Sequence, residues 1–250
     1  MFARIEIQNQ TRTVDLNKAI DISIPLRATA DNPNAFGLAA PRFEPFRAGD
    51  FVGSVRQGGP VNCEDLFINA HGNGTHTECV GHIAHERITI NQSLKQFVFI
   101  ARLITVTPQV TPAGDHVITE EMLNSAAGDD LPPALIVRTL PNDDGKCSRQ
   151  WSGNNPPYFE AAALAMLRER GVEHILTDLP SVDREQDEGA LAGHHAWWDY
   201  PANPRLSSTI TEMIYAPDSV GDGEYLLNIQ IAALETDASP SKPVLYAFVD

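Results

Sequence analysis

The sequence is poor in cysteine and has no long apolar run. Its 250 residues include only three cysteines, Cys63, Cys79 and Cys147, an odd number without a C-x-x-C pair. This usage argues against a disulfide framework and favours a reducing, cytoplasmic location. No stretch approaches the roughly 18 apolar residues of a membrane-spanning helix, and the N-terminus shows no signal-peptide pattern, so we expect no membrane partner.

Basic residues are also scarce, and this scarcity excludes further classes of partner. Against 33 Asp and Glu the chain has only 18 Lys and Arg, which gives a formal net charge of -15 and a pI of about 4.8. Such a surface repels phosphate backbones, so we expect no nucleic-acid partner. The G-x-S-x-G elbow, the phosphate-binding P-loop and the G-x-G-x-x-G fingerprint are all absent. The sequence therefore does not support a serine hydrolase, a P-loop protein or a Rossmann-fold enzyme.

What the sequence does contain indicates one folded domain spanning residues 1–250. Its 42% hydrophobic and 20% charged residues are typical of a globular protein. Short apolar runs predict strands at residues 19–24, 96–107, 134–140, 174–179, 225–234 and 243–249. Helices are predicted at residues 157–170, at residues 119–127 with Thr119 as N-cap, and near residues 187–198. Residues 32–66 and 141–157 are rich in Gly, Pro and Asn and are predicted to be loops.

Histidines are concentrated in one short segment, AHGNGTHTECVGHIAH. Four of the eight fall within fifteen positions: His71, His76, His82 and His85. In an extended backbone His76 and Glu78 point to the same side, where they can share one cation. Imidazole and carboxylate are usual ligands of catalytic Zn or Mn, and His71 would supply a third ligand if Gly72 and Gly74 let the chain bend. The alternative is a glycine-rich turn with exposed histidines.

A second cluster, GHHAWWDYP, lies further along and is followed by Glu212 in STITEMIY. One of the adjacent His194 and His195 should point inward and the other outward. A buried Glu212 in this apolar context would need a cation or a hydrogen-bond donor. Trp151, Trp197 and Trp198 would either line an apolar pocket or belong to the core.

Two other readings of these segments carry less weight. Cys79 precedes His82 by three residues, so a thiolate nucleophile assisted by that histidine is conceivable. The acidic residues 183–188 could hold a cation, although a run of charges is usually a solvated face.

Several ordered motifs resemble the cyclase family of metal-dependent hydrolases, which includes kynurenine formamidase and isatin hydrolase. NGTHTECVGH is similar to the family signature H-x-G-T-H-x-D-x-P-x-H. Glu78 stands in place of the Asp, and His71 lies one position before the first His of the pattern. TDLPSVD, HHAWW, ITEMIY and the opening DISIPL are similar to further family segments in the same order, so the resemblance spans most of the chain.

The resemblance implies an α/β fold of the swivelling β/β/α type, with a mixed, barrel-like β core, peripheral helices and a homodimeric or larger assembly. It also implies hydrolysis of an amide, formamide or lactam in a small-molecule substrate by a metal-activated water. Its implied metal ligands, for one or two Zn or Mn ions, are His71, His76, Glu78, His82, His194 and Glu212. Instead of binding a second ion, His82 with His194 and Glu212 would alternatively act as base and proton shuttle to the leaving nitrogen, and Thr75 would support the ligands with its hydroxyl.

Two other functions fit the same residues. The ligand set would serve a metal-assisted cyclase or dehydratase acting on a carbonyl compound. It would also serve a non-catalytic metal- or small-molecule-binding protein, in which Gly72 and Glu78 mark a decayed site.

Overall fold

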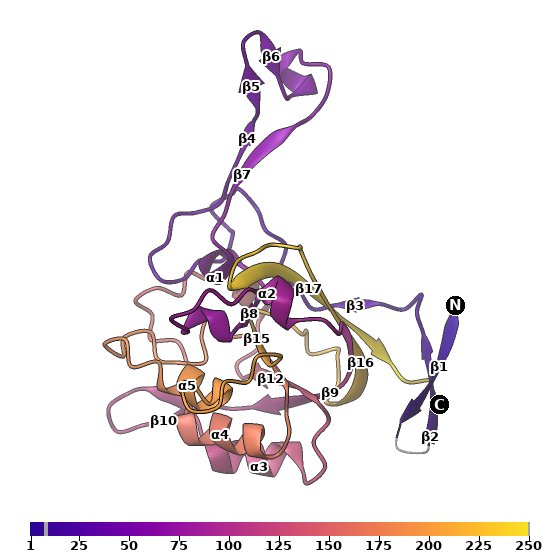
Figure 1. Cartoon of the computed structure of the whole chain (residues 1–250), viewed down its shortest axis with the longest axis vertical. Helices are drawn as coiled ribbons and strands as arrows, with labels where there is room; N and C mark the ends of the chain where they lie inside the picture. The colour runs from indigo at the N-terminus through magenta and orange to yellow at the C-terminus, as the bar shows by residue number, and fades with distance from the viewer. Residues whose placement is uncertain (8–9, 250) are drawn as a thin grey trace.

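The apolar runs pair into one closed β-sheet in the computed structural model, which describes residues 1–7 and 10–249. Seven strands form a ring in the order β16 (Gly223–Ile231), β9 (Val98–Val106), β12 (Ala134–Thr139), β14 (His174–Thr177), β15 (Thr209–Glu212), β8 (His76–Cys79) and β17 (Ala238–Ala247), and β17 pairs again with β16. β3 (Ile20–Asp21) pairs with β17 outside the ring. The expected mixed α/β fold with a barrel-like β core is confirmed (Figure 1).

The two faces of this sheet bury two different apolar clusters. In β12, Ala134 and Ile136 belong to the cluster inside the barrel, whereas Leu135 and Val137 belong to the cluster outside it. This alternation follows from the two-residue period of a strand. β9, β12, β14 and β15 run parallel, and β8 is antiparallel to both of its neighbours, β15 and β17.

Three helices cover the outer face of the barrel. α3 (Glu120–Ala127) begins as predicted, because the hydroxyl of Thr119 accepts a hydrogen bond from the Met122 amide. α4 (Ala161–Glu169) begins later than predicted, because Tyr158–Phe159 forms strand β13. α5 (Ala192–Trp198) occupies the end of its predicted range. All three helices contribute side chains to the outer apolar cluster.

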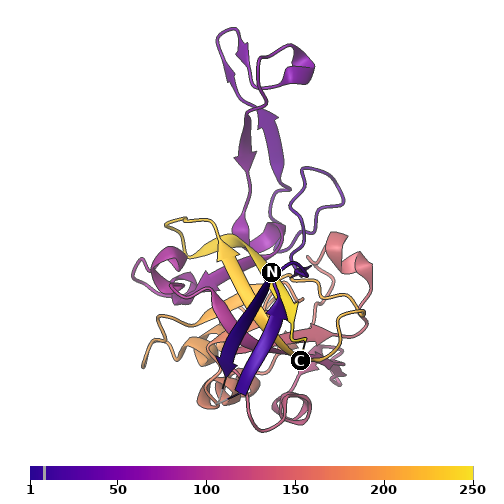
Figure 2. The same ribbon diagram turned by 90° about the vertical axis from the view of Figure 1, so that its right-hand side faces the viewer.

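The prediction of a loop over residues 32–66 is wrong, because much of this segment forms a β-arm. β4 (Arg42–Pro45) pairs with β7 (Glu64–Phe67), and at the tip β5 (Arg47–Ala48) pairs with β6 (Phe51–Val52) beside the 3₁₀ turn η1 (Val55–Gln57). The arm projects away from the barrel (Figures 1 and 2). Its strands bury no face against the body, so they lack the buried-face pattern that the prediction relied on.

Other boundaries differ where local residues override the apolar pattern. The hairpin β1 (Phe2–Ile7) and β2 (Gln10–Asp15) was not predicted, since half of the β1 side chains are exposed. β17 begins before the predicted residue 243 despite Pro240 and Pro243, and β3 is shorter than predicted. The predicted loop at 141–157 contains the 3₁₀ turn η3 (Asp144–Ser148). The remaining elements are α1 (Ala70–Asn73), η2 (Val80–His82), α2 (Ile90–Ser93), β10 (Gln109–Val110) and β11 (His116–Ile118).

His174 gives the fold a testable pH dependence. Burial, with a smaller contribution from Arg205, lowers the pKa of His174 to about 4. The imidazole of His174 therefore binds a proton more readily in the unfolded chain than in the folded one. Above pH 6.5 this difference hardly changes the free energy of unfolding, and below pH 6.5 it lowers that free energy progressively as the pH falls toward 4. From pH 7 to pH 5 this one residue should lower the free energy of unfolding by about 2 kcal/mol.

The variant His174→Asn cannot titrate but has a side-chain amide that can reach the Thr209 hydroxyl, the present partner of His174. It should lose less stability than the wild type between pH 7 and pH 5, as measured by urea unfolding at both pH values. Equal losses in the two proteins would contradict this account.

Candidate metal centre

Strand β8 presents His76 and Glu78 on its outer face. Both side chains are fully buried. Thr77 and Cys79 between them point into the barrel, where the Thr77 hydroxyl lies 2.8 Å from that of Thr211 and Cys79 packs in the inner cluster. The sequence-based expectation that His76 and Glu78 share one side is met in the structure.

His71 and His82 approach Glu78 from the two ends of β8. His71 lies on α1, whose first turn is capped by the Asn69 side chain, and its Nδ1 is 3.1 Å from Glu78 Oε2. His82 ends η2, and its Nδ1 is 3.8 Å from the same oxygen. A Cβ at Gly72 would lie 2.4 Å from Leu38 Cδ1 and 3.0 Å from the Ala35 carbonyl oxygen, so a larger residue there would require the Leu38 side chain to shift.

His194 and Glu212 complete the cluster from α5 and β15. His194 Nε2 is 3.2 Å from Glu78 Oε1, and Glu212 Oε2 is 3.3 Å from His76 Nε2. His195 is directed elsewhere, with its Nδ1 2.9 Å from the Tyr200 carbonyl oxygen. Of the adjacent histidine pair, His194 is therefore the one that faces the site. The six residues predicted as ligands therefore lie in one cluster, in which His71, His76, His82 and His194 lie near Glu78 and Glu212 lies beside His76.

Three of the histidines have one ring nitrogen held by an outer acceptor. His76 Nδ1 lies 3.0 Å from the Gly74 carbonyl oxygen, and His194 Nδ1 lies 2.5 Å from Asp183 Oδ2. His71 Nε2 lies 2.8 Å from Asp237 Oδ2. The other nitrogen of each ring faces the cluster. Histidines that ligate metals characteristically have this arrangement, since the outer hydrogen bond fixes the tautomer and the ring orientation.

Sequence reasoning missed both outer carboxylates. Asp183 ends the TDLPSVD motif and was weighed only as part of the acidic residues 183–188 that could hold a cation, not as the partner of a histidine. Its carboxylate also accepts hydrogen bonds from the amides of Gly193 and His194. Asp237 lies in the segment before β17, where the sequence gives no signal.

Two buried atoms of this cluster have no hydrogen bond, namely His76 Nε2 and Glu78 Oε2. Ring nitrogens lie near Glu78 Oε2 but not in hydrogen-bonding geometry. A buried carboxylate without compensation is costly. Nitrogen and oxygen donors within 4.8 Å of one another form three groups, His71–His76–Glu78, Glu78–His82–His194 and His71–His82–Asp237, of which the first two share Glu78. This donor set fits a divalent ion.

The charges of the cluster support one another. Burial alone would raise the pKa of Glu78, but nearby His82, His194 and His71 lower it well below its usual range. Burial alone would lower the pKa of His71, but the neighbouring carboxylates of Asp237 and Glu78 raise it to about 10. Hydrogen bonds to Asp183 and Glu78 likewise outweigh burial and raise the pKa of His194 to about 10. The carboxylates therefore favour positive charge at this point.

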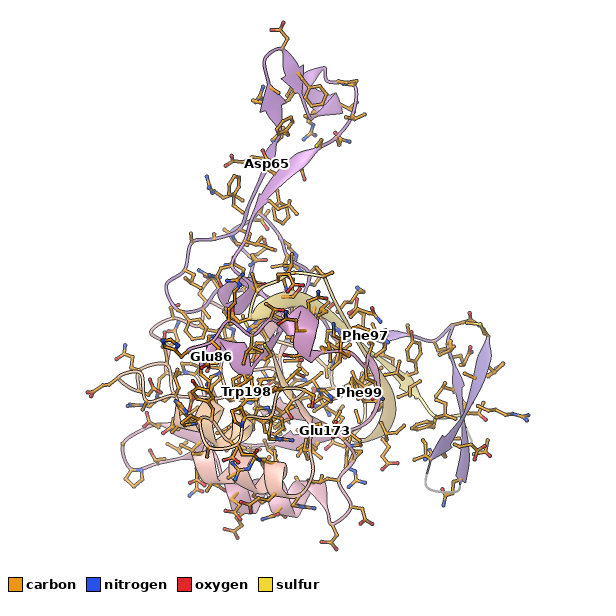
Figure 3. All side chains as sticks on the ribbon, viewed as in Figure 1. Asp65, Glu86, Phe97, Phe99, Glu173 and Trp198 are labelled. Atoms are coloured by element: carbon orange, nitrogen blue, oxygen red, sulfur yellow. The ribbon has the colours of Figure 1, made fainter. Side chains whose placement is uncertain are left out.

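A cavity of about 340 Å³ opens onto the cluster. Its apolar wall is formed by Phe36, Leu38 and Leu191, and its lining includes His71, His82, His194, Glu212, Ser181 and Arg184. Trp151, Trp197 and Trp198 belong to the outer apolar core instead, and Figure 3 labels Trp198 inside the body. The Cys79 thiol is buried on the other face of β8, and burial raises its pKa, so a thiolate paired with His82 is not supported.

The Thr75 hydroxyl links the two segments that carry His76 and Glu212 to a third segment at Ile24. Its hydroxyl donates to the Met213 carbonyl oxygen over 2.5 Å and accepts from the Ile24 amide over 2.8 Å. Met213 follows Glu212 and has a φ of 51°, a conformation that costs energy in a residue with a side chain. The Thr75 hydroxyl thus fixes the backbone beside His76 to the backbone beside Glu212.

Thr75→Val should weaken zinc binding about tenfold, because loss of this hydroxyl frees the backbone that orients the ligands. Zinc affinity is measured by competition with a chromophoric chelator, with circular dichroism as a check on folding. Thr75→Ser, which keeps the hydroxyl, is the matched control and should bind zinc like the wild type. A folded Thr75→Val protein with wild-type affinity would remove Thr75 from the supporting structure.

Comparison with known proteins places this geometry in context. The sequence pattern of a family described as Putative cyclase matches residues 20–184. The kynurenine formamidase of Bacillus anthracis is 27% identical over 231 residues, which cover 92% of this chain and 97% of that protein. The kynurenine formamidase of Bacillus thuringiensis (strain Al Hakam) is 27% identical over 194 residues, covering 77% of this chain and 83% of that protein.

Solved structures have the same fold. Isatin hydrolase A from Labrenzia aggregata, bound to benzyl benzoate, superposes with a TM-score of 0.66 and 17% identity over 92% of this chain and 93% of that one. A predicted metal-dependent hydrolase from Bacillus stearothermophilus superposes with a TM-score of 0.65 and 16% identity over 92% of this chain and 98% of that one.

Proposed function

The chain belongs to the Cyclase family, and on this premise we propose that it is a metal-dependent hydrolase that cleaves the C–N bond of an amide, formamide or lactam. The observation that carries the proposal is the convergence of imidazole nitrogens on the buried Glu78 carboxylate, with His76 Nε2 and Glu78 Oε2 left without hydrogen bonds. Such a cluster is stable in a folded protein when a cation compensates it.

The proposed ligands of one ion are His71, His76 and Glu78, and those of a second ion are Glu78, His194 and Glu212, with His82 beside them. The carboxylates and imidazoles admit either Zn or Mn. A divalent ion bound there supplies a Lewis acid for the scissile carbonyl and lowers the pKa of a bound water from about 15.7 to about 7.

His82 is the proposed proton carrier. Its side chain is 28% exposed and lines the cavity, whereas the His194 side chain is 3% exposed and both of its ring nitrogens are engaged. Glu212 has one oxygen bound to the Val182 amide and the other beside His76, so it is better placed to hold an ion than to move a proton. His82 would take a proton from the attacking water and deliver it to the leaving nitrogen.

The proposed substrate is a small molecule with an apolar, arylformamidase-like group. Phe36, Leu38 and Leu191 contribute apolar surface to the cavity that the polar cluster also lines. Two of the similar proteins are named for a formamide of kynurenine and for the lactam isatin. Incorporation of one solvent oxygen-18 per turnover separates hydrolysis from the cyclase or dehydratase alternative, in which no solvent oxygen enters the product.

His76→Ala should abolish both metal binding and turnover, because it removes a fully buried ligand at the centre of the cluster. The measurements are elemental analysis of metal per chain, which also separates one ion from two, and hydrolysis of N-formylkynurenine and isatin. His195→Ala is the matched control. It removes the histidine next to His194 that faces Tyr200 instead of the cluster, and it should retain metal.

Retention of full activity by His76→Ala would refute the hydrolase proposal. A wild type that binds its metal but turns over no amide, formamide or lactam would favour the non-catalytic alternative.

We further propose that residues 1–250 act as one domain in a cytoplasmic homodimer or larger homo-oligomer. The three cysteines are free, as expected in a reducing compartment. No helix among the described residues has the length and hydropathy to span a membrane. Large apolar side chains along the arm are exposed, which suits self-association: Phe46, Phe51, Val55, Val61, Leu66, Phe67 and Ile68.

Shortening the arm tests this assembly. The Phe46 amide donates to the Cys63 carbonyl oxygen over 2.8 Å, so a two-residue Asn-Gly turn can replace residues 47–62 and leave β4 and β7 paired. The shortened protein should be a monomer by light scattering coupled to size-exclusion chromatography, while its metal content stays at the wild-type value. A monomeric wild type, or an unchanged oligomer after shortening, would contradict the proposal.

A further inference from the structure

Asp237 directly precedes β17 and contacts the metal centre from there. Its carbonyl oxygen accepts a hydrogen bond from the Cys79 amide over 3.0 Å, and the next residue, Ala238, is in register with Glu78. The backbone of Asp237 is thereby fixed to the end of β8, one residue from the central carboxylate. Asp237 lies outside residues 20–184, over which the family pattern matches, so its placement rests on this geometry.

One oxygen of Asp237 contacts two histidines. Oδ2 is 2.8 Å from His71 Nε2 and 3.2 Å from His82 Nδ1. The two imidazole rings lie beside each other, with centroids 4.3 Å apart and an interplanar angle of 32°. Asp237 therefore contacts both a proposed ligand and the proposed proton carrier, and it uses opposite ring nitrogens of the two.

We propose that Asp237 is the positioning residue that sets complementary tautomers in His71 and His82. A neutral imidazole carries one N–H, and a carboxylate hydrogen bond fixes which nitrogen carries it. In His71 the N–H would be at Nε2, which leaves the Nδ1 lone pair facing Glu78 and the ion. In His82 the N–H would be at Nδ1, which leaves the Nε2 lone pair to accept a proton.

This inference rests on the proposed function, because His82 acts as a proton carrier only if the protein is a hydrolase. It adds that one carboxylate, which is not among the six proposed ligands but shares a candidate donor group with His71 and His82, supports both metal retention and proton transfer. A merely structural role would affect folding alone, whereas positioning affects metal affinity and kcat together and leaves KM nearly unchanged.

The experiment compares Asp237→Ala and Asp237→Asn with Glu235→Gln in the full-length zinc-loaded protein. Glu235 lies in the same segment, and its carboxylate accepts hydrogen bonds from Thr89 and Asn91 while its backbone carbonyl oxygen accepts one from Arg87, so it controls for disturbance of the loop. Asp237→Ala should lower kcat about 10- to 100-fold and zinc affinity about tenfold, with KM within about threefold of wild type. Asp237→Asn keeps a carbonyl oxygen and should recover part of both losses. Glu235→Gln should behave as wild type.

A second readout does not require turnover. Nitrogen-15 NMR of the imidazole rings in the zinc-loaded protein should show His71 protonated at Nε2 and His82 protonated at Nδ1, and both assignments should be lost in Asp237→Ala. A wild type without amide, formamide or lactam hydrolysis would refute the proposed function but leave this readout intact. The same tautomers and the same zinc affinity in Asp237→Ala and Glu235→Gln would overturn the role of Asp237.

Discussion

The structure depends on one buried carboxylate, Glu78, being surrounded by histidines from separate parts of the chain. A fully buried carboxylate loses its hydration, and the cost is several kcal/mol unless charge and hydrogen bonds compensate it. Here the compensation comes from His71 on α1, His82 on η2 and His194 on α5. These elements are short and have little helical stability of their own. Their attachment to the barrel and the stability of the charge therefore depend on each other.

Strand β8 is suited to this role because it separates two environments. Its inner face belongs to the barrel core, in which Cys79 is buried and the hydroxyls of Thr77 and Thr211 satisfy each other. Its outer face carries the polar cluster. The hydrogen bonds of β8 to β15 and β17 on its two sides hold its backbone rigidly, so that the side chains of His76 and Glu78 are fixed in direction. Rigid strands place ligands more precisely than loops do.

The sequence predicts what short-range periodicity controls. The two-residue period places His76 and Glu78 together, and the apolar runs locate most strands of the barrel. The choice between His194 and His195 requires the packing of α5, which directs one imidazole toward Glu78 and the other toward Tyr200. Short-range periodicity cannot identify Asp237, because Asp237 reaches the site only through the pairing of β17 with β8, two strands that are far apart in the sequence. The arm was not predicted because none of the residues in β4 and β7 is buried, so these strands lack the alternation of buried and exposed residues that identifies a strand.

The negative charge around Glu78 favours either protonated histidines or a metal ion at the same site. Four carboxylates surround the histidines, from Glu78, Asp183, Glu212 and Asp237, in a chain that already carries a net charge of -15. The carboxylates raise the pKa of His71 and of His194 to about 10, so at neutral pH two ring protons partly balance the negative charge. A divalent ion bound beside either ring would require the facing nitrogen of that ring to be neutral, so the ion would replace a ring proton as the source of positive charge. The outer hydrogen bonds that fix the rings are the same in either state, so ion binding need not rebuild the surrounding fold.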